Sequence, residues 1–341
     1  MSTSSLGVGI VGMGNIGTMH ARALRDLGER ATLVAYSSSR EATPVALAGW
    51  EAVRLAPERV LDHPAVDIVA ICSPSGTHAR LALAALEAGR HVVVEKPLAL
   101  SVEDAVTISR VAGERGLMVS TISQRRFEPE HERLRSALDA GALGEIRLAT
   151  THVHWFRDDD YYAAASWRTT VEQGGGSLVN QGVHNVDLLR WFCGPVESVT
   201  AQYGTLAHAM EAEDTTVATL RFASGALGVV TTTTATPPGH PATLSVHGAR
   251  GTVELGQGEA RRWDVPGFPA PPSGTVATGA ADPLAIGHRG HRAQWDGILS
   301  ALEGSSPVPV DVDDAVQTVR LLCAIYAAAA TGEAVRPGDL T

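Results

Sequence analysis

The sequence contains 341 residues, which predicts about two domains, each large enough to bury its own core. Hydrophobic residues make up 44% and charged residues 19%, a composition that excludes a disordered chain or a coiled coil. The 37 acidic residues outnumber the 27 basic ones, giving a net charge of -10. This balance argues against nucleic acid or a membrane surface as a partner, because both require a cationic protein face.

Three scattered cysteines, Cys72, Cys193 and Cys323, suit neither a disulfide framework nor a thiolate zinc site. The N-terminus lacks the charged region that opens a secretion signal. No run approaches the ~20 apolar residues that a membrane-spanning helix needs. We therefore expect a soluble, cytoplasmic protein.

The first part of the chain alternates short apolar runs with helical patterns. We predict strands at 6–11, 32–36, 67–71, 91–94 and 117–120. We predict helices at 19–27, 77–87 and 102–114. This repeated strand-helix-strand order is typical of α/β proteins, and it predicts a Rossmann-type, doubly wound parallel sheet over residues 1–122.

The second part, residues 123–341, contains longer runs that are rich in Thr and Val. We predict strands at 145–156, 197–206, 214–222, 226–235 and 243–255. We predict helices at 128–140, 177–192, 288–302 and 312–330, and a long surface loop at 256–283. Mostly antiparallel strands with helices to one side predict an α+β domain.

A glycine-rich turn follows the first strand and opens the first helix. The turn reads Gly12-Met13-Gly14-Asn15-Ile16-Gly17. Gly12 permits the tight turn, Gly14 lets the backbone approach a pyrophosphate, and Gly17 allows the helix to pack closely on the strand. We expect a dinucleotide at this turn, bound at the positive helix N-terminus.

The end of the second strand bears on the choice of cofactor. About 20 residues after the glycines stand Ser37, Ser38 and Arg40, with no carboxylate to repel a 2′-phosphate. This pattern favours NADP over NAD, although an ordinary solvated turn would have the same sequence.

A lysine follows the predicted strand at 91–94, within Glu95-Lys96-Pro97. Ligands of open α/β sheets bind beyond the carboxyl ends of the strands, so we expect Lys96 beside the nicotinamide, with Glu95 and Pro97 as further cofactor-binding residues. The bond to Pro97 can be cis. Ser73, Pro74 and His78 end the preceding strand in the same way and are further cofactor candidates, with a packed structural role equally open for His78.

A glycine-led helix at 174–187 carries a polar stripe. Asn180, His184 and Asp187 are spaced i, i+4, i+7, which places them on one face of a regular α-helix. His184 is the natural general acid or base, because an imidazole titrates near neutrality. Asn180 and Asp187 would orient it or a substrate hydroxyl.

These elements together resemble the glucose–fructose oxidoreductase / inositol dehydrogenase family. The resemblance rests on 12–17, 71–78, 95–97, 124–127 and 174–187 and covers nearly the whole chain. It implies that the second domain has a large open sheet through which homodimers or homotetramers form. It also implies that Lys96 and His184 are catalytic. The family often has Asp where this chain has Asn180, and an amide cannot titrate, so only hydrogen bonding is left to Asn180.

The resemblance implies oxidation of a ring hydroxyl of a sugar, sugar derivative or inositol, with hydride passing to nicotinamide. Substrate contacts are expected from Lys96, Asn180, His184, Arg126, Trp155, Arg157, Trp167 and Arg168, with His291 as a further candidate. His152 and His154 share a strand face, but without an obvious third ligand we expect no metal.

Three alternatives remain open from the sequence. The enzyme could run in reverse, as an NADPH-dependent reductase of a keto-sugar or anhydrosugar. A sugar nucleotide could be the substrate. The chain could also be a cofactor-bound regulatory protein without turnover, although the presence of both Lys96 and His184 argues against this.

Overall fold

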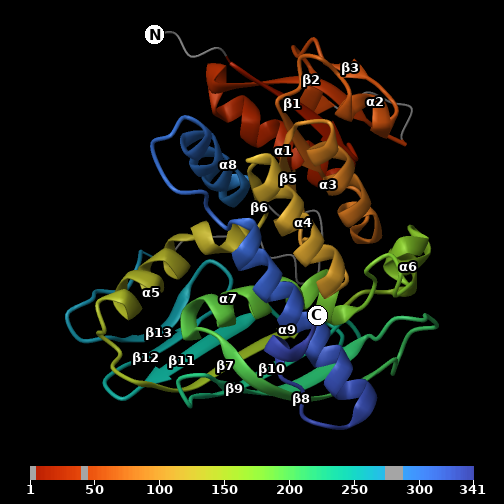
Figure 1. The fold of residues 1–341 in the computed structure, drawn as a ribbon. Helices are drawn as coiled ribbons and strands as arrows, with labels where there is room; N and C mark the ends of the chain where they lie inside the picture. The colour runs from red at the N-terminus through yellow and green to blue at the C-terminus, as the bar shows by residue number, and fades with distance from the viewer. Residues whose placement is uncertain (1–4, 40–44, 273–286) are drawn as a thin grey trace. The chain divides into compact units, whose positions relative to one another are not determined.

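The structure is a computed structural model that describes residues 5–39, 45–272 and 287–341. It divides into two compact units, one formed by residues 1–124 and 287–319 and the other by residues 125–286 and 320–341. Each unit has its own sheet and core, and we describe each by itself (Figure 1).

The first unit is built on a six-stranded parallel sheet. Its strands are β1 (Leu6–Val11), β2 (Ala31–Ser37), β3 (Val53–Arg54), β4 (Ile68–Ile71), β5 (His91–Val94) and β6 (Val119–Thr121). They lie in the order β3-β2-β1-β4-β5-β6. The order reverses between β1 and β4, which is the point where doubly wound sheets bind their ligands. The predicted Rossmann sheet is confirmed, and only the short strand β3 was missed.

Helices cover both faces of this sheet. They are α1 (Asn15–Asp26), α2 (Pro57–Leu61), α3 (His78–Glu87), α4 (Val102–Arg115) and α8 (Arg289–Leu302). Helices α1 and α8 lie side by side. The sheet face that these two helices cover contains a fully buried core around Ile10, Leu33 and Trp295. Burial on both faces explains why the strands read as continuous apolar runs.

The second unit is built on a seven-stranded sheet. Its strands are β7 (Ile146–His154), β8 (Val196–Gly204), β9 (Thr215–Phe222), β10 (Leu227–Thr233), β11 (Thr243–Gly248), β12 (Thr252–Leu255) and β13 (Ala260–Asp264). The order is β13-β12-β11-β7-β10-β9-β8, and every pair except β7–β10 is antiparallel. The predicted, mostly antiparallel sheet is confirmed.

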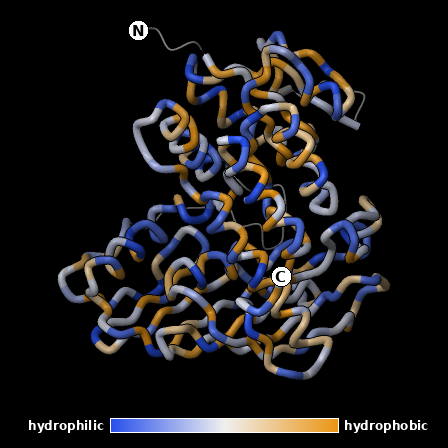
Figure 2. Tube along the Cα trace, in the orientation of Figure 1, coloured by the Kyte–Doolittle hydropathy of each residue, from blue (hydrophilic) through white to orange (hydrophobic). Residues whose placement is uncertain are grey.

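Helices of the second unit lie against one face of its sheet. They include α5 (Pro129–Asp139) and α7 (Val183–Cys193), and α9 (Val312–Thr331) enters the unit at residue 320. The short helix α6 (Asp159–Ala163) contacts the 3-10 turn Ser166–Arg168. Residues of β7 that face the core, such as Val153, are buried, whereas Leu148, Val217 and Leu227 are 40–49% exposed on the other face. Hydrophobic and hydrophilic residues are interspersed along these strands in Figure 2.

Three predictions in this unit were wrong in detail. The single strand expected at 243–255 is a hairpin, because a turn between Gly248 and Gly251 separates β11 from β12. The loop expected at 256–283 contains β13, which pairs with β12, and its residues 273–283 lie outside the described residues. The helix expected at 177–192 begins with a π-helical segment, Ser177–Gly182, before α7.

Candidate functional site

The glycine turn has the geometry that a dinucleotide needs. Gly12 has φ +99°, and a Cβ there would lie 2.7 Å from the backbone of Cys72. A Cβ on Gly17 would lie 2.4 Å from the carbonyl oxygen of Gly12, whereas Gly14 has open space around it. The N-cap residue of α1 is Gly14, which has no side chain to cap the helix N-terminus. The turn is therefore tight on the protein side and open at Gly14 and the helix N-terminus, which fits a pyrophosphate.

The predicted selectivity residues are only partly described. The hydroxyl of Ser37 is buried and accepts a hydrogen bond from the amide of Gly12 at 3.1 Å, so it supports the glycine turn. The carbonyl of Ser38 accepts a hydrogen bond from Arg54 at 2.9 Å. Arg40 lies outside the described residues. The preference for NADP stays a prediction.

Lys96 stands at the carboxyl end of β5, in the same unit as the glycine turn. Strand β5 pairs with β4, and β4 pairs with β1, so the ends of all three strands meet at one sheet edge. The Lys96–Pro97 bond is cis, as the sequence allowed. Lys96 is also the only lysine in the 341-residue sequence.

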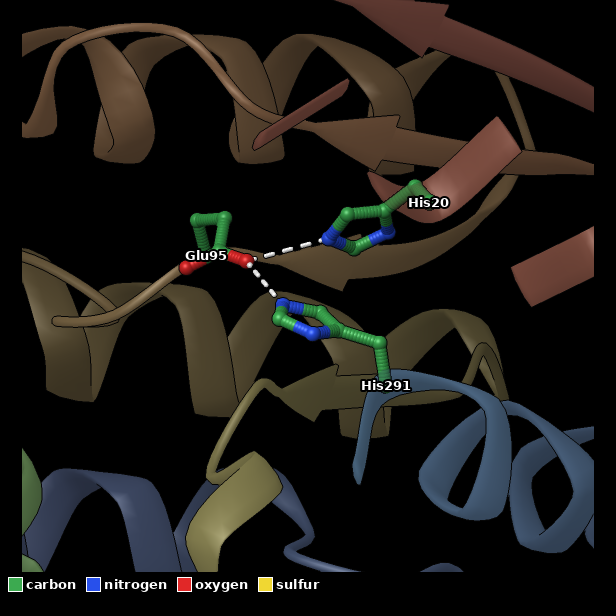
Figure 3. A group of neighbouring side chains, drawn as sticks. All are labelled: His20, Glu95 and His291. Atoms are coloured by element: carbon green, nitrogen blue, oxygen red, sulfur yellow. Dashed lines mark hydrogen bonds and ion pairs between the residues drawn. The ribbon is translucent and has the colours of Figure 1, made fainter. Parts of the chain in front are cut away.

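Buried histidines surround the Glu95-Lys96-Pro97 segment. His20 from α1 and His291 from α8 place Nε2 at 3.0 and 3.2 Å from Oε1 of Glu95, as Figure 3 shows. Burial raises the pKa of the Glu95 carboxyl, but these hydrogen bonds outweigh it and hold that pKa well below its usual range. His291, expected near the substrate, instead lies in this interior cluster.

His78 of α3 supports the same segment. Its Nδ1 lies 2.7 Å from the carbonyl oxygen of Pro97, and its Nε2 lies 2.9 Å from that of Ser73. The ring is 1% exposed, and burial lowers its pKa despite these carbonyls. This geometry supports the structural alternative for His78 over direct contact with a cofactor.

His184 and Asn180 lie in the second unit on consecutive helical segments. Asn180 belongs to the π-helical segment and His184 to the first turn of α7, and both are half-buried. The wide π turn breaks the regular α-helical spacing on which the shared face was predicted. The third member of that stripe, Asp187, is buried and receives a hydrogen bond from Arg126 Nε at 2.8 Å. Asp187 and Arg126 thus form a structural ion pair, and the predicted substrate contact of Arg126 finds no support in its position.

A residue that the sequence analysis missed holds the π-helical segment. Glu213 accepts hydrogen bonds from the amides of Ser177 and Leu178 at 3.0 and 2.9 Å and from the Tyr326 hydroxyl at 2.8 Å. Burial raises the pKa of Glu213, and these bonds oppose that shift. The carboxylate acts as the cap of the helix N-terminus. Its position, 35 residues after Leu178, gives no local sequence signal.

The predicted substrate residues of the second unit form a cluster of arginines and aromatic rings. The Arg157 guanidinium lies 5.1 Å from the Trp155 ring centre, and that of Arg168 lies 4.0 Å from the Tyr161 ring and 5.4 Å from Trp167. The Tyr161 hydroxyl accepts a hydrogen bond from Gln181 at 3.0 Å. Gln181 follows Asn180 in the π-helical segment, so this arginine–aromatic cluster adjoins the predicted catalytic helix.

Two groups of side chains within the described ranges have metal-ligating types close together, His20/Glu95/His291 and Glu128/Glu130/His131. His152 and His154 belong to neither group. They instead share the hydroxyl of Thr231, at 2.8 and 2.7 Å. Among the helices that the structure describes, we find none with the length and apolarity needed to cross a membrane.

Comparison with known proteins agrees with this geometry. Residues 6–123 match the oxidoreductase family with an NAD-binding Rossmann fold, and residues 131–254 match the GFO/IDH/MocA C-terminal domain. The chain is 30% identical to myo-inositol 2-dehydrogenase of Thermotoga maritima over 72% of this chain and 74% of that one. It is 27% identical to scyllo-inositol 2-dehydrogenase (NAD(+)) of Bacillus subtilis over 72% of each.

A solved structure covers almost the whole chain. The WlbA dehydrogenase from Bordetella pertussis, in complex with NADH and UDP-GlcNAcA, is 33% identical with a TM-score of 0.89. The match covers 98% of this chain and 99% of that one. The two matched domains and the full-length similarity confirm the predicted family, and the chain belongs to the glucose–fructose oxidoreductase / inositol dehydrogenase (Gfo/Idh/MocA) family of NAD-binding oxidoreductases.

Proposed function

We propose that the protein is an NAD(P)-dependent dehydrogenase that oxidises a ring hydroxyl of a sugar derivative or an inositol. The observation that carries this proposal is the shared sheet edge of the first unit. There a glycine turn suited to a pyrophosphate follows β1 and the only lysine of the chain follows β5, with β4 between the two strands. The inositol dehydrogenases and the sugar-nucleotide dehydrogenase among its relatives support the same reaction class.

The chain supplies an ammonium, an imidazole and an amide to this reaction. When bound, the nicotinamide cofactor provides the hydride acceptor. The Lys96 ammonium donates a hydrogen bond to the reacting oxygen and stabilises alkoxide character. His184 takes the hydroxyl proton, since an imidazole exchanges protons near neutral pH. Asn180 binds a hydroxyl without titrating.

The arginine–aromatic cluster favours one substrate class in particular, an acidic sugar or sugar nucleotide. Aromatic rings stack on the C–H faces of sugars, and arginine forks bind carboxylates and phosphates. The Nε of Arg168 is buried with no hydrogen-bond partner within the described part of the chain. UDP-GlcNAcA, the ligand of the Bordetella relative, is such a molecule.

A cofactor-reduction screen tests the function. The purified protein is assayed with NAD and with NADP against inositols, neutral aldoses, anhydrosugars, uronic acids and nucleoside-diphosphate sugars, and in the reverse direction with NADPH against keto-sugars. We expect turnover with at least one cyclic polyol or sugar class, and the NAD-to-NADP ratio of kcat/KM tests the predicted preference for NADP. Turnover only of a keto-sugar with NADPH would favour the reductase. Cofactor binding without turnover of any class would favour the regulatory alternative.

Arg168→Lys separates neutral from acidic substrates. The lysine keeps the charge but loses the planar fork and the stacking on Tyr161. For an acidic substrate we expect KM to rise about tenfold with kcat little changed, whereas for a neutral polyol KM should change less than about threefold. An equal, small effect on both substrate types would remove the support for an acidic substrate. Arg262→Lys, on exposed β13, is the matched control.

Assembly is a further part of the proposal. The sheet face opposite the helices exposes Leu148, Val217 and Leu227, and burial of such side chains favours association. We propose a homodimer or homotetramer through this face, to be measured by light scattering of the purified protein.

A further inference from the structure

The histidine-bound carboxylate of Glu95 suggests a role that the proposed reaction does not use directly. We propose that Glu95 is a positioning residue for Lys96. It is an ionised, buried carboxylate, held by two neutral histidines, that fixes the Lys96 backbone and favours the ammonium form of its side chain. This inference rests on the proposed role of Lys96, and all of its residues lie in the first unit.

The first step is the protonation state of His20. The indole N–H of Trp295 lies 3.0 Å from His20 Nδ1, and an indole nitrogen can only donate. Nδ1 of His20 must therefore accept, which leaves the single ring proton on Nε2. That proton points to Glu95 Oε1, 3.0 Å away (Figure 3). Burial lowers the pKa of His20 despite the neighbouring carboxylate, which agrees with this neutral tautomer.

His291 is the second ring that contacts Glu95, and its contacts fix its protonation state. Its Nε2 lies 3.2 Å from the same oxygen of Glu95, and because an ionised carboxylate only accepts, Nε2 carries a proton. Its Nδ1 is buried and has no hydrogen-bond partner among the residues described. A second proton on Nδ1 would be buried without an acceptor, which costs free energy. His291 is therefore neutral as well.

The third step is the charge that remains on Glu95. Two neutral rings donate to Oε1 but do not neutralise it, and the residue is only 6% exposed. The next residue along the chain is Lys96, and its backbone amide lies 3.3 Å from Oε2 of Glu95. A buried negative charge next to an amine favours the ammonium form, because Coulomb attraction is stronger in the protein interior than in water.

Hydrogen bonds on both sides of Lys96 hold its backbone in place. Glu95 ties the catalytic segment to α1, which begins at the glycine turn, and to α8. On the other side, His78 bonds the carbonyl of Pro97. Lys96 is thus held between two anchored neighbours. Fixing a catalytic group in this way matters, because misplacement by about 1 Å can cost a hundredfold in rate.

The arrangement needs no metal ion to hold it together. Both histidines contact Glu95 directly at hydrogen-bond distance, and Trp295 already occupies the second nitrogen of His20. The site is a hydrogen-bonded cluster in which His20 and His291 both donate to Oε1 of Glu95.

The main test is Glu95→Gln in the full-length protein. Glu58→Gln is the matched control, because Glu58 is exposed and its carboxylate forms a 3.7 Å ion pair with the exposed Arg80. The variant keeps the shape but removes the charge, and its amide presents an N–H toward the Lys96 amide or toward a histidine donor. We expect kcat to fall about 10- to 100-fold. The cofactor dissociation constant should stay within about threefold of the wild-type value, because the glycine turn is unchanged.

A second readout does not depend on turnover. Because Lys96 is the only lysine, protein labelled with ¹³C-lysine gives one Cε resonance from that residue. We expect its titration midpoint to move down by about one pH unit in Glu95→Gln and not in Glu58→Gln. His20, His78, His291 and Cys72 also surround Glu95, so the midpoint is fitted together with the histidine titrations. An unchanged lysine titration together with an unchanged kcat would overturn the proposal.

Trp295→Phe provides the test if Glu95→Gln fails to fold. It removes the indole N–H that fixes His20, together with part of the buried ring, so we expect a roughly three- to tenfold lower kcat and a mixture of His20 tautomers in ¹⁵N-histidine spectra. A wild-type His20 protonated on Nδ1 would contradict the hydrogen-bond directions inferred for the cluster.

Tight, stoichiometric Zn²⁺ binding that Glu95→Gln abolishes would also overturn the proposal, because the cluster would then be a metal site. If Lys96→Met is active, the proposed function fails, while the lysine titration still reports on Glu95.

Discussion

The two units each contain a group of histidines, and the groups behave differently. In the first unit, His20 and His291 are fully buried and share the carboxylate of Glu95. In the second unit, His152 and His154 are half-buried and share only the hydroxyl of Thr231. With His240 and Arg261 they line a cavity of about 360 Å³ on the sheet.

The contrast shows that partners and burial, rather than residue type, decide what a histidine does. A carboxylate and an indole fix the proton of His20 at one nitrogen. A hydroxyl can donate or accept, so Thr231 leaves the protons of His152 and His154 undetermined. Burial lowers the pKa of both, and for His154 repulsion from His152 and His240 adds to the effect. We therefore expect large effects from changes in the first group and small ones in the second.

The largest effect is expected at Lys96, the residue that the first group serves. Lys96→Met should lower kcat/KM by about a thousandfold or more, because the hydrogen bond and charge at the reacting oxygen are lost. Cofactor binding, followed by fluorescence or calorimetry, should persist. An active Lys96→Met enzyme would contradict the assignment of Lys96 as a catalytic residue.

The same substitution in both groups compares them directly. His20→Ala leaves the Trp295 indole without an acceptor, removes a donor from Glu95 and creates a cavity, so we expect a loss of about 2–4 kcal/mol in the free energy of unfolding. His154→Ala should cost about 0.5 kcal/mol or less, since water replaces its contacts. Both losses are to be measured by urea denaturation. Equal losses would refute the distinction between the two groups.

The first unit also shows which parts of the site can be predicted from the sequence. The glycine turn and the place of Lys96 follow from local patterns, because each lies within a few residues of the strand that positions it. The sequence allowed a cis bond to Pro97 but did not predict it. The partners of Glu95 could not be predicted in this way. His20, Glu95 and His291 are separated by 75 and 196 residues and meet only because α8 returns to the first sheet, which no local pattern encodes.

The second unit illustrates a different limit. Strand alternation located β7 through β10 well, but regular helical spacing failed at Ser177–Gly182. There a Cβ on Gly182 would lie 2.4 Å from Thr232, and the distant Glu213 caps the segment. Tertiary contacts of this kind override local periodicity, and they moved Asp187 from the predicted polar stripe into an ion pair with Arg126.

Acid should destabilise the protein in two pH windows, one set by the histidines of both groups and one set by Glu95 of the first group. The pKa of His20, His152 and His154 is lowered by burial, so the unfolded rings bind protons first and stability falls as the pH drops below about 6.5. For Glu95, hydrogen bonds outweigh burial and lower the pKa, so its contribution is present above pH 4.5 and is lost as the pH falls further.

Unfolding free energies measured from pH 8 to pH 3 test this assignment. Glu95→Gln should be less stable at neutral pH and should lose less stability below pH 4.5 than the wild type. The double variant His152→Asn/His154→Asn should flatten only the window below about pH 6.5. A wild-type slope below pH 4.5 that Glu95→Gln leaves unchanged would show that Glu95 is not ionised in the folded protein.

The smallest effect is expected at Thr231. Thr231→Val removes the hydroxyl that His152 and His154 share but keeps the β-branched shape, which suits a strand. Because both rings reach solvent, water can replace the lost hydroxyl, and the free energy of unfolding should change by about 0.5 kcal/mol or less. Trp295→Phe also removes a hydrogen-bond donor, but this donor belongs to the buried cluster of the first unit. Because His20 is fully buried and water does not replace the donor, the expected loss in the free energy of unfolding is about 1–3 kcal/mol. A Thr231→Val loss as large as that of Trp295→Phe would mean that the half-buried histidines are held as firmly as the buried ones.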